Sequence, residues 1–297
     1  MSRAVIDLTI LPAPDVVEAL DYETVLAAML SDLKARDESF SAIVESDPVY
    51  KILEVAAYRE TLLRQRVNDA ARAVMLAFST GGDLDHLGAL FNVSRLIIDP
   101  GDPDAIPPVA PTMESDKKFR YRCQMAFEGL SVAGPVGAYE FHALGASGKV
   151  KDVSIQSPAP GKVDVVVLST VGDGAPDAEL LAAVEAAVNR EEVRPLTDEV
   201  AIIAAEVVHY ELSATLILYE EPDAGVVLAA AIATANAWVA NQHALGHDIT
   251  LSGLYAALHQ AGVQKVILAS PTDNIVISPY QAAWCDAVNV AVGGRDE

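Results

Sequence analysis

The sequence is poor in cysteine and in basic residues, and it lacks a recognisable secretion signal. Two cysteines, Cys123 and Cys285, are too few for a disulfide framework, so we expect synthesis in a reducing cytoplasm. The first four residues lack the basic-then-apolar layout of a signal peptide. We also expect no uncharged apolar stretch of about 18 residues, and therefore no segment that spans a membrane.

The shortage of basic residues restricts the partners that the chain can have. It has 20 Lys and Arg against 42 Asp and Glu, which gives a net charge of −22. Because nucleic acids and anionic membranes attract basic proteins, we expect neither as a partner. Residues 1–50 hold ten acids and three bases, whereas residues 51–122 hold ten of each. This distribution suits charge-steered contacts with other subunits, and simple solubility explains it equally well.

What is present indicates folded material of about two domains. The chain has 297 residues, of which 52% are hydrophobic, and disordered chains are poor in such residues. Residues 1–15 predict an extended N-terminal arm, and the apolar spacing over residues 16–33 predicts a first helix. Cys123 falls on the apolar stripe of a further helix over residues 115–130, which favours a small core residue over a nucleophile.

A long helix is predicted from Pro48 to Phe78, with Asp47 as its cap and Pro48 in its first turn. Gly81 and Gly82 should end it, and Asp83 should cap a short helix that follows. The apolar stripe of the long helix comprises Ile52, Ala56, Leu63, Val67, Ala70 and Val74. The opposite side carries four basic residues, Arg59, Arg64, Arg66 and Arg72.

These four arginines are the candidate protein-interaction residues. We expect the long helix to pair with other long helices at a subunit interface, where the arginines meet acidic surfaces. Charge reversal at Arg64 and Arg66 should then impair assembly and leave the monomer folded. Unchanged assembly would contradict an interface on that face.

A Pro/Asp-rich segment, residues 99–111, predicts a linker or an excursion loop. Three of its residues, Asp99, Asp102 and Asp104, could suggest a calcium site. The alternating ligands, central glycine and closing glutamate of an EF-hand loop are missing, so a loop without an ion is favoured.

Residues 150–203 predict a compact α+β lobe. Two β-rich runs, 150–155 and 163–168, are joined by a short Pro/Gly loop and predict a β-hairpin. The Gly172-Asp173-Gly174 turn leads to a helix that Pro176 can start. This turn lies where a phosphate loop would, but it lacks both phosphate-binding glycine patterns and carries an acid. We therefore interpret it as a turn.

The rest of the chain predicts a second lobe. It has a long strand over residues 207–219, two helices (224–241 and 250–260), and three short strands (263–269, 275–277 and 288–292). The segments VKDVSIQSP (150–158) and VQKVILASP (263–271) align almost position for position, which favours two related lobes.

The predicted fold class is α+β, with a helical N-terminal half followed by two small related α+β lobes that contain β-hairpins. The predicted parts are an N-terminal arm, a helical assembly domain, a Pro/Asp linker, helices with the first lobe, and the second lobe (1–15, 16–98, 99–114, 115–210 and 211–297).

Patterns that would indicate catalysis are weak. His243 and His247 have the i, i+4 spacing of a shared metal site, but Gly246 indicates that the helix ends there. No glutamate follows His243 in the zinc-protease pattern. No ordered catalytic triad is visible, although triads form in space and not in sequence. We assign no catalytic, metal or cofactor residue.

Several contiguous segments together resemble one family. They are residues 40–60 (FSAIVESDPVYKILEVAAYRE), 64–70 (RQRVNDA), 83–88 (DLDHLG), 132–139 (VAGPVGAY), 153–158 (VSIQSP), 160–163 (PGKV) and 194–198 (RPLTD). They are similar to the baseplate J-like proteins of contractile phage tails. The resemblance implies a structural wedge subunit of the tail baseplate in a phage, a tailocin or a related injection system, and it brings no catalytic residues.

The resemblance also implies the partners. They are other copies of the chain in a ring around the hub and spike, a small lysozyme-fold-like wedge protein, and a wedge partner that bears tail fibres. Two alternatives remain open: a metal-dependent hydrolase that uses His243, His247 and Asp248, and a soluble adaptor that binds one protein. Bound metal would favour the first of these, and a lack of recurrence in a ring would favour the second.

Overall fold

The computed structural model describes residues 6–12, 14–221 and 223–296, and the fold class is α+β, as predicted. The chain forms two compact units. Unit 1 contains Met1–Arg95 and Ser115–Gln124, and unit 2 contains Leu96–Glu114 and Met125–Glu297. Within the predicted N-terminal arm, residues 1–5 and 13 lie outside the described residues, and Leu8–Ile10 forms a 3-10 helix (η1).

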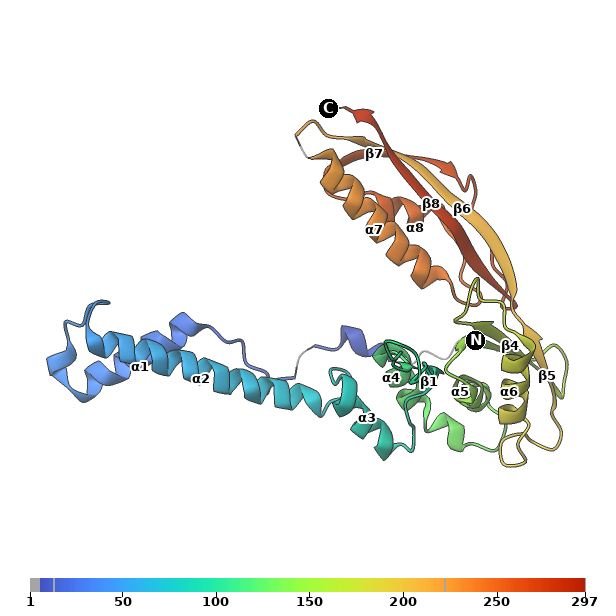
Figure 1. The fold of residues 1–297 in the computed structure, drawn as a ribbon, viewed down its shortest axis with the longest axis horizontal. Helices are drawn as coiled ribbons and strands as arrows, with labels where there is room; N and C mark the ends of the chain where they lie inside the picture. The colour runs from blue at the N-terminus through green and yellow to red at the C-terminus, as the bar shows by residue number, and fades with distance from the viewer. Residues whose placement is uncertain (1–5, 13, 222, 297) are drawn as a thin grey trace. The chain divides into compact units, whose positions relative to one another are not determined.

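Unit 1 is helical (Figure 1). Its elements are α1 (Tyr22–Arg36), a 3-10 helix η2 (Glu38–Phe40), α2 (Pro48–Ala73), α3 (Gly81–Leu90) and α4 (Asp116–Met125). Helix α1 begins later than predicted, because the side chain of Asp21 accepts a hydrogen bond from the Thr24 amide and caps the helix there. Helix α1 packs along α2.

The long helix starts as predicted and ends earlier. Asp47 is the N-cap and Pro48 the first residue, but α2 ends at Ala73, so its length is about 39 Å at ~1.5 Å per residue. Beyond the helix end, the Arg120 guanidinium donates to Leu76 O (2.7 Å) and Ser79 O (2.6 Å). The prediction of a helix to Phe78 was therefore wrong at its end.

The two glycines after α2 begin the next helix and do not end the previous one. Thr80 is the N-cap of α3, and Gly81 and Gly82 form its first turn. The Gly81 amide, which has no partner within the helix, donates to a side-chain oxygen of Asp116 (3.1 Å). This contact joins the start of α3 to the start of α4.

The predicted linker is an ordered hairpin arm. Strands β1 (Ile97–Asp99) and β2 (Thr112–Met113) pair antiparallel. After the arm, α4 is followed by a separate 3-10 helix, η3 (Glu128–Leu130), where one continuous helix over residues 115–130 was predicted. Farther out along the arm, Asp102 and Val109 exchange two backbone hydrogen bonds of 3.0 and 2.8 Å.

The first lobe contains α5 (Val136–Ala146), β3 (Val150–Gln156), β4 (Lys162–Ser169), α6 (Ala178–Val188) and β5 (Glu199–Ala204). The predicted hairpin is confirmed, because β3 and β4 pair antiparallel, and β5 then joins β4 in parallel. Pro176 does not start α6. Asp177 is its N-cap and accepts the Leu180 amide at 2.7 Å.

The second lobe contains β6 (Glu206–Leu218), α7 (Ala224–Gln242), α8 (Leu251–Leu258), β7 (Val263–Ser270) and β8 (Gln281–Arg295). Its sheet has the order β7-β6-β8, so β7 and β8 flank β6 and do not pair as a hairpin. The similar segments 150–158 and 263–271 both supply an edge strand antiparallel to the central strand of its sheet. The predicted strand 275–277 makes a single bridge, between Ile249 and Ile275.

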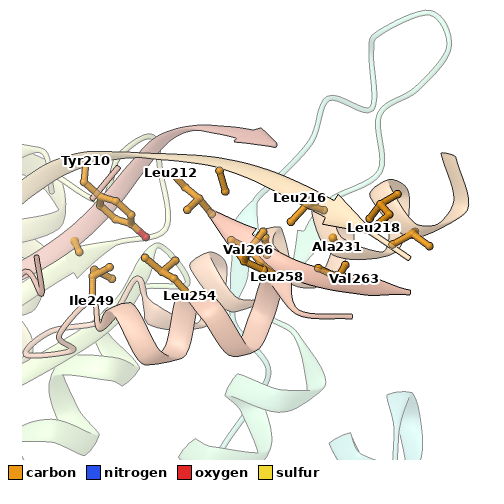
Figure 2. Packing of buried hydrophobic residues seen from close by; sticks show 14 of the residues in the cluster. Tyr210, Leu212, Leu216, Leu218, Ala231, Ile249, Leu254, Leu258, Val263 and Val266 are labelled. Atoms are coloured by element: carbon orange, nitrogen blue, oxygen red, sulfur yellow. The ribbon is translucent and has the colours of Figure 1, made fainter. Parts of the chain in front are cut away.

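The core of the second lobe lies between the sheet and two helices (Figure 2). Alternate residues of β6, namely Leu212, Leu216 and Leu218, are fully buried against α7 and α8. Within the described residues α7 is the single helix long and apolar enough to span a membrane by composition, with a mean hydropathy of 1.5. The expectation that no such stretch exists was wrong. Val227, Ala231 and Ala235 of α7 are buried in this core.

Candidate protein interaction surface

One side of α2 is occupied by the chain itself. Ala57 and Asn68 of α2 are buried, as is Leu26 of α1. Asn68 Nδ2 donates to Glu18 O (2.9 Å), and the Glu18 amide donates to Asn68 Oδ1 (3.0 Å). This reciprocal pair holds the segment before α1 against one side of α2. The segment therefore covers that side of the helix and does not cover the opposite side.

The remaining surface of α2 is apolar and exposed. Seven large apolar side chains are between 44% and 69% exposed, namely Ile52, Val55, Tyr58, Leu62, Leu63, Val67 and Val74. We call these residues the α2 apolar face. Most of them are three or four residues apart, so they lie on one side of α2, and Val74 is the C-cap residue that follows the helix. Monomeric proteins rarely expose a continuous apolar surface of this kind unless it is an interaction site.

Two of the four predicted arginines lie within this face. Arg59 and Arg66 lie four residues before and three residues after Leu63, so they are its neighbours on the helix surface. The prediction that they lie opposite the apolar stripe was wrong. Arg59 and Arg66 follow two exposed apolar residues, Val55 and Leu62, by four residues each, so they share a side of α2 with them. In the described part of the chain no hydrogen bond or ion pair engages either guanidinium.

The other two arginines have different surroundings. Arg64 pairs with Glu60 (2.7 Å) and with Glu18 (3.1 Å), and these partners raise the pKa of its guanidinium. Arg64 therefore ties α2 to the segment before α1, and its charge reversal would disturb unit 1 as well as any interface. Arg72 lies in the last turn of α2, where a cation is favourable to the helix dipole.

The Gly-Asp-Gly turn has a structural role. Gly172 and Gly174 have positive φ angles of 62° and 101°. A Cβ on Gly174 would lie 2.9 Å from the His243 ring, so only glycine fits there. Asp173 Oδ1 accepts the Ala175 amide (3.1 Å), which closes the turn. Its other carboxylate oxygen lies near the ring of His209.

His209 lies between two carboxylates from different elements. Its Nδ1 is 2.8 Å from Asp286 Oδ1 on β8, and its Nε2 is 3.5 Å from Asp173 Oδ2 in the turn. The hydrogen bond that the His209 ring donates to Asp286 and the charges of both carboxylates raise the pKa of His209 above its ordinary value. The stabilisation from these pairs is present below the ordinary histidine pKa and is lost as the pH rises through the raised value.

We expect the Asp286→Asn substitution to lower the pKa of His209 towards its ordinary value, because it removes the nearer negative charge. Asp173→Asn should lower the pKa less, since that carboxylate is farther away. Titration of the His209 ring protons by NMR measures both changes. Equal pKa values in the wild type and in Asp286→Asn would contradict this arrangement.

The predicted metal candidates do not share a helix face. Helix α7 ends at Gln242, before both histidines. His243 is buried, and its Nδ1 is 2.8 Å from Ala283 O. Burial lowers the pKa of His243. Asp248 Oδ1 accepts the Ile277 amide (2.7 Å). Among the residues that the structure describes, no group of three metal-binding side chains comes together. Cys123 is buried, as expected of a core residue.

Sequence reasoning missed part of the surface. The predicted stripe omitted Val55, Tyr58 and Leu62, although their spacing of three and four residues was a usable signal. It also missed that the apolar residues are exposed, because periodicity marks a face and does not say what covers it.

Three family models match the chain in order. They are the baseplate J-like N-terminal domain (residues 45–102), the baseplate J-like central domain (131–204) and the baseplate J-like protein C-terminal domain (210–291). The chain is also 49% identical over 300 residues to baseplate protein J of Escherichia phage P2, with 99% of each chain covered. Helix α2 lies within the first match, and the resemblance predicted from the sequence is confirmed.

Proposed function

Because the chain belongs to the baseplate J-like family, we propose that it is a structural wedge subunit in the baseplate of a contractile phage tail or a related injection device. It is made in the host cytoplasm and resides in the virion. The observation that carries this proposal is the 49% identity to a phage baseplate protein over almost the whole chain. The three family matches fall in each of the three parts of the chain in turn, so the similarity is not confined to one domain.

The α2 apolar face supports an assembly role. A helix about 39 Å long that leaves one side apolar and exposed is suited to pairing with other long helices. Burial of this face removes apolar area from water, which is the main favourable term in most protein association. Arg59, Arg66 and Arg72 then meet acidic surfaces of the neighbours, whereas Arg64 acts within its own unit.

The subunit links wedge partners around the central hub and its spike. The proposed partners are other copies of the chain in a ring, a small lysozyme-fold-like wedge protein and a wedge partner that bears tail fibres. A net charge of −22 disfavours nucleic acid and anionic membrane as partners.

The relative is a baseplate protein, and a structural role needs no reaction centre, so we propose no catalytic residue and no cofactor. The alternative of a metal-dependent hydrolase needs His243 and His247 on one helix face, and α7 ends before both. The alternative of a soluble adaptor is separated from the wedge role by whether the chain recurs in a particle.

Depletion of the chain from cells that produce the particle should stop baseplate assembly, because a wedge subunit cannot be bypassed in a ring. We expect no tails with complete baseplates by negative-stain electron microscopy, and restoration when the chain is supplied in trans. Complete baseplates in the depleted cells would contradict the proposed function.

A further inference from the structure

The hairpin arm of residues 96–114, which we call the acidic arm, is held in shape by hydrogen bonds within itself. Besides the Asp102–Val109 backbone pair, two aspartates close local turns within it. Asp99 Oδ1 accepts the Gly101 amide (2.8 Å), and Asp102 Oδ1 accepts the Asp104 amide (2.9 Å). Such local bonds order a loop before it meets a partner, which lowers the entropy cost of binding.

The surface of the acidic arm is both negative and apolar. From Leu96 to Asp116 the sequence has acids and no Lys or Arg. Near the tip Ile106 is 99% exposed, and Val109 is also exposed. An ordered segment that presents a bare isoleucine beside carboxylates fits a partner surface that is apolar with a basic edge.

The α2 apolar face has this complementary chemistry. Val55 and Leu62 form an exposed apolar ridge, and Arg59 and Arg66 follow them by one turn each. In a chain with a net charge of −22, a surface that combines exposed apolar side chains with unpaired guanidinium groups can attract a second copy of the same chain.

We infer that the acidic arm of one copy docks on the α2 apolar face of a neighbouring copy. Asp102 and Asp104 meet Arg59 and Arg66, and Ile106 packs against Val55 and Leu62. The inference rests on the proposed function and names the acidic surface that the arginines meet. Two different surfaces are used, so the contact is head-to-tail, and such contacts close into rings when the rotation permits.

A charge exchange between full-length chains tests this contact. The first variant, D102R/D104R, makes the arm positive, and the second, R59E/R66E, makes the helix face negative. Each variant alone places like charges together, so its self-association should weaken by more than about tenfold. Mixing the two restores opposite charges at contacts between unlike variants. The positive arm of D102R/D104R meets the negative face of R59E/R66E, and the acidic arm of R59E/R66E meets the unchanged arginines of D102R/D104R. Sedimentation velocity over a concentration series measures association of the wild type, each variant and the mixture.

We expect the wild type and the mixture to associate and each variant alone to remain monomeric, with weaker association of the wild type at high salt. The control E191R/E192R, which changes the charge equally at exposed residues outside the arm, should associate as the wild type does. A wild type that stays monomeric, variants that associate normally, or a mixture that fails to associate would each overturn the inference. A contact between the arm and α2 of one copy is also excluded by rescue, because mixing cannot repair it.

The charge exchange and the depletion experiment can fail independently of each other. If the mixture fails but the chain is still required for baseplates in the depletion experiment, the wedge role stands and the arm docks elsewhere. If depletion leaves baseplates intact, the wedge role fails whatever the charge exchange shows.

Discussion

Replacing Leu63 and Val67 together by glutamate is expected to keep the chain out of the baseplate while the chain itself stays folded. Both side chains are more than half exposed on α2, so charge there costs the isolated chain little. In the assembled wedge the two carboxylates would be buried at an apolar contact and would compete with the acids of the neighbour for Arg59 and Arg66, at a cost of about 3 kcal/mol or more. Incorporation should therefore fall by roughly a hundredfold or more.

This result is measured by supplying the variant in trans to depleted cells and quantifying the chain in purified particles. Circular dichroism of the purified variant checks that α2 still forms. Leu196→Glu is the control, because Leu196 is fully exposed and belongs to the first lobe and not to α2. Normal incorporation of the double variant would show that the α2 apolar face is not an interface.

The Leu216→Ala substitution is expected to destabilise the second lobe by about 2–5 kcal/mol, because it removes buried methyl groups and leaves a cavity. Leu216 is fully buried on the central strand, opposite Val266 of β7 and Val292 of β8. The cavity would open between the sheet and its covering helices, where neighbouring side chains are held by their own packing.

Urea unfolding followed by tryptophan fluorescence measures this effect selectively, since both tryptophans, Trp238 and Trp284, belong to the second lobe. The exposed Leu196→Ala should stay within about 0.5 kcal/mol of the wild type. Equal unfolding midpoints for Leu216→Ala and the wild type would mean that the alternating face of β6 is not the core.

Features fixed by local chemistry were predictable from the sequence. Asp47 and Pro48 marked the start of α2, and the Pro/Gly loop after residue 156 marked the β3–β4 hairpin. In both cases the residues that define the feature are neighbours in the chain. The caps of α1 and α6 were missed although they are local. The apolar spacing indicated a start of α1 before Asp21, and Pro176 indicated a start of α6 before Asp177.

Features fixed by distant residues were not predictable. The end of α2 depends on Arg120, which binds carbonyls 41 and 44 positions away in sequence. The pairing of β8 in parallel with β6, and not with β7 as a hairpin, depends on partners far apart in the chain. No periodicity carries that information.

The candidate surface was half predictable. The sequence marked an apolar stripe and four arginines on one helix. Only the structure separates Arg64, which is paired within its unit, from Arg59 and Arg66, which lie among the exposed apolar residues of α2. The same spacing would describe a helix buried in its own domain, since it is tertiary contact that decides which faces remain exposed.

An electron cryomicroscopy reconstruction of the intact baseplate would show where this chain lies and what covers its α2 apolar face. We expect repeated copies of the chain around the hub, with Leu63 and Val67 of α2 buried against neighbouring helices. A baseplate without this chain, or one in which the α2 apolar face points into solvent in every copy, would contradict it.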